Sequence, residues 1–185
     1  MKKLILLFFI CLSQLCLSQD KNTNKFFNDI YSNFKEGYSD NIAIYYSEEE
    51  LDKNFTTRLY KQLKEVLNNK SKFYGFGGTS NEENLLEFSN AEKEYIIKEA
   101  KNPANFQEKD YLSNIEGYES FKKLDRDKHH LRSFLSKPIF IRNNTLCIIY
   151  TATYSGMLSA GGGWKVYKFK NGKWKTWINL TMWIS

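Results

Sequence analysis

Four lysines surround the dipeptide Asn171-Gly172, and ammonium groups gathered in this way could bind an anion. They are Lys168, Lys170, Lys173 and Lys175, and Trp177 follows two residues later. Clustered ammonium groups attract phosphates and carboxylates, and an indole ring offers a stacking surface. We therefore predict that these five residues bind an anionic envelope component or an acidic protein. The lysines could instead form a solvated face that prevents pairing with other chains.

The two histidines of the chain are adjacent, His129 and His130. Neighbouring residues point in different directions on a regular element, so we do not expect them to share a metal ion. Asp125 and Asp127 lie close by, and either histidine could serve as an acid or base in a small ligand-pocket protein or hydrolase. No Gly-x-Ser-x-Gly elbow and no Cys/His cluster accompany them. The sequence therefore predicts no catalytic residue, metal site or cofactor, with a histidine-based hydrolase as the alternative.

The elements that would position the lysines are two strands joined by Asn171-Gly172. Asn-Gly between alternating segments indicates a two-residue type I′ hairpin, whose turn sets the register. The predicted opposite pairs are Lys170 with Lys173, Phe169 with Trp174, Lys168 with Lys175, Tyr167 with Thr176, and Val166 with Trp177. All four lysines then share one face, where like charges directly opposite destabilise the sheet. Such a face requires solvent, salt or an anion.

The rest of the sequence predicts helices first and an antiparallel β-meander last, an α+β fold. Helices are expected at 24–36 with Asn24 as cap, at 48–69 after a Ser47–Glu50 capping box, and from Ser89 or Asn90 to just before Pro103. Residues 41–46 alternate as a strand does. Further strands are expected at 138–142, 145–154, 164–170 and 173–184, with a glycine-rich connection at 155–163. No regular element is assigned to 71–88, and 104–133 receives only a short helix near Ile115–Leu124.

The first residues have the order of a secretory signal peptide: Met1-Lys2-Lys3, an apolar run from Leu4 to Leu12, then a more polar stretch. We predict residues 1–18 as signal and 19–185 as one α+β domain, helical over about 19–127 and sheet over about 134–185. Nine apolar residues span only about 14 Å as a helix, too short for a permanent anchor. We thus expect a periplasmic or secreted protein without a transmembrane span.

Cleavage after Ser18 would leave Cys147 as the single cysteine. Because it lies in an apolar run and nothing nearby would lower its pKa, we expect a buried structural thiol.

The formal net charge of +6 is unevenly distributed. Residues 128–185 contain nine Lys or Arg and no Asp or Glu, whereas residues 19–127 contain 16 basic and 21 acidic residues. Composition excludes a collagenous, disulfide-framed or disordered chain. Lysine lacks the planar fork of arginine, so we expect no specific nucleic-acid recognition.

Four features stand out near the end of the chain: Ser136-Lys137-Pro138-Ile139-Phe140, the bend from Tyr154 to Gly163, Tyr167, and Asn171-Gly172-Lys173-Trp174. Together they resemble a group of small exported bacterial proteins without assigned function. Members of that group often carry two cysteines in the bend. Ser155 and Ser159 stand at those positions here, so the resemblance implies no redox role. Helices followed by a curved meander also resemble the nuclear-transport-factor-2-like cone fold, an architectural likeness that says little about function.

Overall fold

The computed structural model describes residues 22–30, 42–45, 53–75, 84–101, 131–155 and 159–185. Outside these residues lie the predicted signal peptide, the Ser47–Glu50 capping box, the short helix near Ile115–Leu124, Asp125, Asp127 and both histidines. The described helices are residues 22–30, α2 (Lys53–Asn69) and α3 (Asn90–Lys101). None of them is long and apolar enough to cross a membrane.

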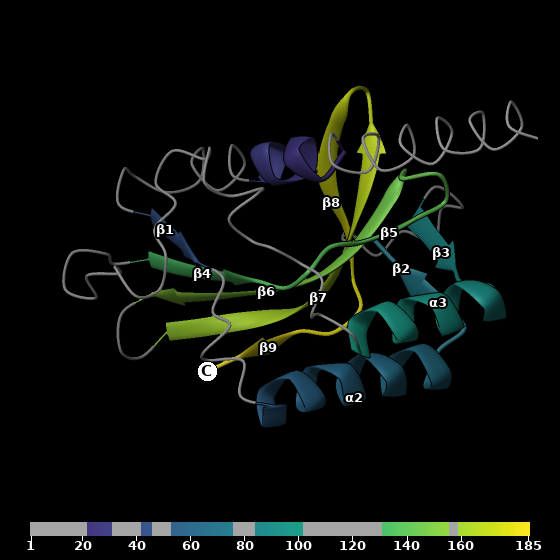
Figure 1. Cartoon of the computed structure of the whole chain (residues 1–185), viewed down its shortest axis with the longest axis horizontal. Coiled ribbons are helices and arrows are strands. Elements are labelled where there is room, and N and C mark those ends of the chain that lie inside the picture. Colours follow the sequence, from purple (N-terminus) through teal and green to yellow (C-terminus); the bar gives the residue numbers. More distant parts are fainter. Residues whose placement is uncertain (1–21, 31–41, 46–52, 76–83, 102–130, 156–158) are drawn as a thin grey trace, which may run out of the picture.

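A mostly antiparallel sheet and these helices form the predicted α+β fold (Figure 1). Its central path is β1-β4-β6-β7-β8, with β5 paired to β6 and β9 paired to β7. The strands are β1 (Ile42–Tyr45), β4 (Leu131–Leu135), β5 (Ile139–Ile141), β6 (Leu146–Ser155), β7 (Ser159–Lys170), β8 (Lys173–Asn179) and β9 (Trp183–Ile184). β1 pairs with β4 in parallel, and all other pairs in this sheet are antiparallel.

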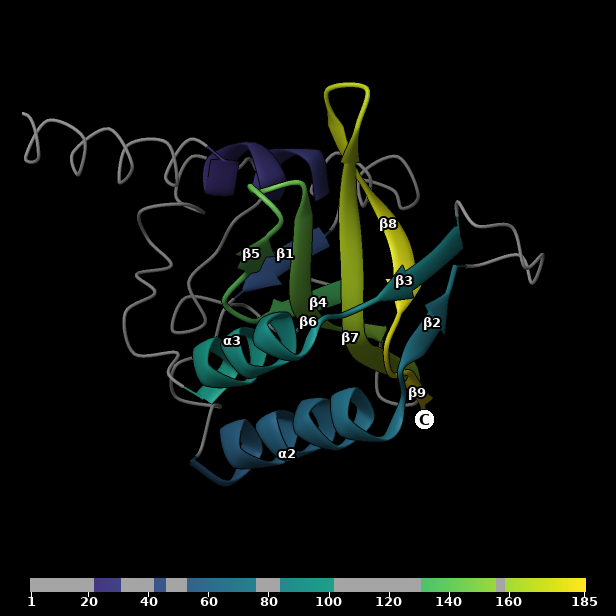
Figure 2. The same ribbon diagram turned by 90° about the vertical axis from the view of Figure 1, so that its right-hand side faces the viewer.

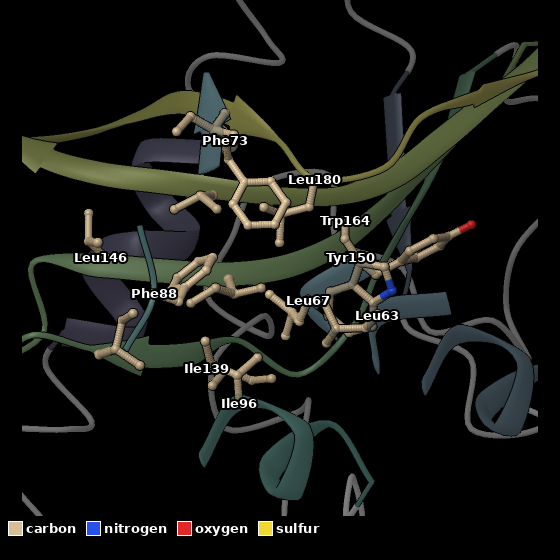
Figure 3. Close-up of a cluster of buried hydrophobic side chains, with 14 of the residues drawn as sticks. Leu63, Leu67, Phe73, Phe88, Ile96, Ile139, Leu146, Tyr150, Trp164 and Leu180 are labelled. Carbon is tan, nitrogen blue, oxygen red and sulfur yellow. The ribbon is translucent and has the colours of Figure 1, made fainter. Parts of the chain in front are cut away.

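Helices α2 and α3 cover one face of this sheet, which we call the α2/α3 face (Figure 2). Leu59, Leu63 and Leu67 repeat every four residues along α2, as the sequence pattern requires of a buried stripe, and all three are buried. They pack with Ile96 of α3, with alternate residues of β6 and β7, and with Ile178 of β8, as Figure 3 shows for part of the cluster. Trp164 of β7 also donates its indole N–H to the Leu59 carbonyl at 3.1 Å.

The helix at residues 22–30 lies against the opposite face near the β7–β8 hairpin, and we call this side the 22–30 face (Figure 1). The Phe26 ring lies 5.2–5.6 Å, centroid to centroid, from Phe27, Phe140, Tyr167 and Trp174. These edge-to-face contacts are the geometry that aromatic quadrupoles prefer. Because both faces are covered here, β6 is buried continuously from Leu146 to Ala152, which explains the apolar run from Leu146 to Tyr150.

The second capping box predicted from the sequence is confirmed. Ser89 N–H donates to the Glu92 carboxylate at 2.9 Å, and Glu92 N–H donates to the Ser89 hydroxyl oxygen at 3.2 Å. The Asn24 cap is wrong, since helix 22–30 already includes Asn24. α2 agrees with its prediction from Lys53 onward.

Three strands occur where the sequence suggested none. β2 (Lys72–Tyr74) and β3 (Leu85–Glu87) form a separate two-stranded sheet within 71–88, and Phe73 and Leu86 enter the core. β4 begins at Leu131, so the sheet part starts earlier than position 134. Each segment is short and gains its regular form by pairing, which local periodicity does not reveal.

The glycine-rich segment is mostly strand rather than a connection, which corrects the prediction. Gly161, Gly162 and Gly163 lie inside β7 and pair with β6. A Cβ on Gly163 would overlap the Thr181 carbonyl oxygen, and one on Gly162 would lie 2.6 Å from the Thr151 oxygen. The glycines are therefore needed for close approach of backbones, as Trp183 and Ile184 return to pair with Gly162 and Gly161.

Candidate anion-binding surface on the β7–β8 hairpin

The turn of the hairpin has the predicted type I′ geometry. Asn171 has φ 55° and Gly172 has φ 77°, both in the left-handed region that this turn requires. Lys170 pairs with Lys173 and Lys168 with Lys175, so these lysine pairs are confirmed. The hairpin end extends beyond α2 and α3, which lie toward the other end of the strands (Figure 2). We call the surface made by Lys168, Lys170, Lys173 and Lys175 the lysine face.

The lysine face is open and carries uncompensated charge. Lys170, Lys173 and Lys175 are exposed, while Lys168 is half-buried. Within the described ranges, none of the four forms an ion pair. In each of the two pairs, like charges lie directly opposite each other, which costs about 0.2–1 kcal/mol per pair. A bound anion would reduce this repulsion between the lysines.

The reverse side of the hairpin is anchored to helix 22–30. Trp174 and Tyr167 are buried against Phe26. Asp29 accepts a hydrogen bond from the Trp174 backbone N–H at 2.9 Å. Because Trp174 is on the outer strand of this hairpin, the Asp29 carboxylate satisfies an edge N–H that could otherwise pair with another chain. The anchored side holds the lysine face in a defined orientation.

Trp177 does not lie opposite Val166, so this predicted pair is wrong. A β-bulge between Val166 and Tyr167 shifts the register, and Val166 pairs with Ile178 instead. Trp177 is half-buried against the core on the α2/α3 face. The Lys168 ammonium lies 4.3 Å from the centroid of its ring, a cation–π contact. One face of the indole is thus occupied by the protein's own lysine, which reduces the surface available for stacking.

Cys147 is fully buried in β6 and free, and burial raises the pKa of its thiol well above the ordinary value. A thiol in this state is a poor nucleophile and acts as a small apolar side chain. Among the residues that the structure describes, no three His, Cys, Asp or Glu side chains group closely enough to hold a metal ion.

The α3 helix carries the charge partners of two other basic residues, which lie just before and just after β5. Arg142 Nε donates to Glu92 at 2.7 Å, and the Lys137 ammonium lies 2.9 Å from Glu99. The hydrogen bond from Arg142 lowers the pKa of the Glu92 carboxyl. These two basic residues are neutralised in place, whereas the lysine face is not.

No family model, curated protein or solved structure matches the chain.

Proposed function

We propose that this is an exported bacterial binding protein without enzymatic activity, whose lysine face docks onto an anionic component of the cell envelope. The observation that carries the proposal is the presence of two neighbouring lysine pairs on one face of an anchored hairpin. These lysines have no acidic partners in the described part of the chain. The arrangement of Met1-Lys2-Lys3 before an apolar run supports export. A periplasmic or secreted protein would meet anionic polymers and lipid headgroups.

The docking contact is electrostatic in this proposal, so its strength depends on salt. Lysines near an anionic surface contribute about 1 kcal/mol each, and the attraction falls off within a Debye length of about 10 Å at 0.1 M salt. Four lysines that act together therefore support reversible binding that is strong at low salt and weak at high salt. The half-exposed Trp177 would lie at the margin of the contact.

The test is a charge reversal of the lysine face. Lys168, Lys170, Lys173 and Lys175 are changed together to Glu, and co-sedimentation with an anionic bacterial envelope extract is measured at low and high salt. The matched control changes four exposed lysines of the helices to Glu, with the same shift in net charge: Lys61, Lys64, Lys98 and Lys101.

We expect the hairpin variant to lose at least tenfold in affinity at low salt, while the helix variant keeps most of its binding. Equal losses of affinity in both variants would mean that only net charge matters, and the lysine face would be rejected as the docking surface. Retained binding by the hairpin variant would have the same consequence.

A further inference from the structure

The bulge at Trp177 places an ammonium group and a buried, unpaired amide oxygen opposite each other in the middle of the sheet. Continued without a bulge, the hairpin register would set Lys165 opposite Ile178. With the extra residue, Lys165 pairs with Asn179 and Ile178 stays in the core opposite Val166. Residues directly opposite share one face, and alternation puts Lys165 and Asn179 on the 22–30 face, away from the lysine face. Bulges often redirect side chains beside functional sites.

Lys165 is a half-buried cation with no acidic ion-pair partner among the residues that the structure describes. Its two flanking residues, Trp164 and Val166, are buried on the α2/α3 face, and Ile149 lies directly opposite on β6. No residue of the described ranges forms an ion pair with its ammonium group. Burial lowers the pKa of Lys165, with no carboxylate acting in the other direction. Half-buried ammonium groups usually have a carboxylate partner, so this one is available to a ligand.

Asn179 has the opposite need. Its Oδ1 atom is buried and has no hydrogen-bond donor in the described part of the protein. A buried acceptor left without a donor destabilises the fold because nothing compensates for the loss of its contact with water. Lys165 does not satisfy it, although the two residues are direct neighbours across the strands. The Lys165 ammonium therefore lacks a protein acceptor in the described residues, and Asn179 Oδ1 lacks a protein donor.

A single small molecule could satisfy both residues. We propose that Lys165 and Asn179 bind a small hydroxycarboxylate, with the carboxylate on the Lys165 ammonium and the neighbouring hydroxyl donating to Asn179 Oδ1. The buried Ile149 side chain provides an apolar wall for the carbon skeleton. Tyr167, next along this face, shares a hydrogen bond with Thr176, and burial raises its pKa to about 12, so it stays neutral and adds no competing negative charge.

The partly buried position of Lys165 favours a small ligand over a polymer or a membrane. A polymer or membrane surface reaches the lysine face at the exposed hairpin end, whereas Lys165 lies between buried residues of three paired strands. The two sites are on opposite faces of β7, so each can fail without the other.

The test uses the full chain with 13C-labelled lysine and follows the ε-CH2 signals by NMR during titration with glycolate. The Lys165 signal is assigned as the one missing from Lys165→Arg. Acetate, which lacks the hydroxyl, and ethylene glycol, which lacks the carboxylate, are the comparison ligands. Asn179→Leu removes the acceptor half of the site and keeps the Lys165 signal, and Lys175→Met is the matched control on the other face.

We expect glycolate to shift the Lys165 signal saturably, with an affinity at least fivefold higher than that of acetate and no saturable shift by ethylene glycol. Asn179→Leu should bring glycolate down to the affinity of acetate, and Lys175→Met should bind like the parent. Equal affinity for glycolate and acetate in the parent, or no saturable shift of Lys165 by glycolate, overturns the proposal whatever the folding of the variants.

Discussion

Substitution of Gly163 by alanine tests the close approach of β7 to the returning chain. The added Cβ would overlap the Thr181 carbonyl oxygen and lie 2.7 Å from the Thr181 carbonyl carbon and 3.1 Å from Met182 Cα. All these atoms belong to backbone, which no rotamer change can move. We therefore expect the segment at 180–182 to be pushed away from β7.

The cost follows from the hydrogen bonds that hold this segment. Trp164 N–H donates to the Thr181 hydroxyl at 2.9 Å, and the Trp164 carbonyl accepts from Leu180 N–H at 2.8 Å and from Thr181 N–H at 3.3 Å. At about 1 kcal/mol each, their loss lowers the free energy of unfolding by about 3 kcal/mol. Displacement of β9 from Gly161 and Gly162 adds to this.

Gly172→Ala is the matched control, because nothing lies within 4 Å of the added Cβ and only the positive φ is strained. That strain costs about 1–2 kcal/mol. Urea unfolding followed by circular dichroism measures both variants. If Gly163→Ala is no more destabilising than Gly172→Ala, the close approach of β7 and residues 180–182 is not as described.

Three further predictions follow from the packing and the charges. Phe26→Ala should lower the free energy of unfolding by about 3–5 kcal/mol and shift the emission of Trp174, because it removes the ring at the centre of the aromatic cluster; an unchanged urea midpoint would contradict that packing. Because the pKa of Glu92 is lowered in the folded state, its pair with Arg142 stabilises the protein above pH 4.5 and this contribution is lost as the pH falls through the folded pKa. The difference in stability between the parent and Arg142→Gln, at most about 1 kcal/mol for this half-exposed pair, should therefore shrink in acid, and a constant difference in urea unfolding from pH 7 to 3 would refute the pairing. Cys147 should resist iodoacetamide at pH 8 in the folded protein and react in urea, as mass spectrometry can show; rapid labelling without urea would mean that the thiol is not buried.

The sequence determined the features that depend on a few neighbouring residues. Asn171-Gly172 adopts left-handed φ values at low cost, so the turn and the lysine pairs beside it follow from backbone sterics. The Ser89 and Glu92 capping box lies within one helical turn, and the leucine stripe of α2 follows from the 3.6-residue period. The buried state of Cys147 follows in the same way from the apolar run around it.

Only the tertiary structure decided the features that depend on distant partners. The bulge at Trp177 keeps Ile178 in the core and brings Asn179 opposite Lys165, a choice made by packing against α2 and α3 and not by the turn. The sequence predicts Gly163 in a loop, and only the structure shows that the Thr181 backbone packs directly against it. β4 is too short to be recognised alone, and it becomes a strand by pairing with β6 and, across some 85 residues of sequence, with β1. The lysine face was visible in the sequence because its cause is local, whereas the Lys165–Asn179 pair was hidden because its cause is the register of the whole sheet.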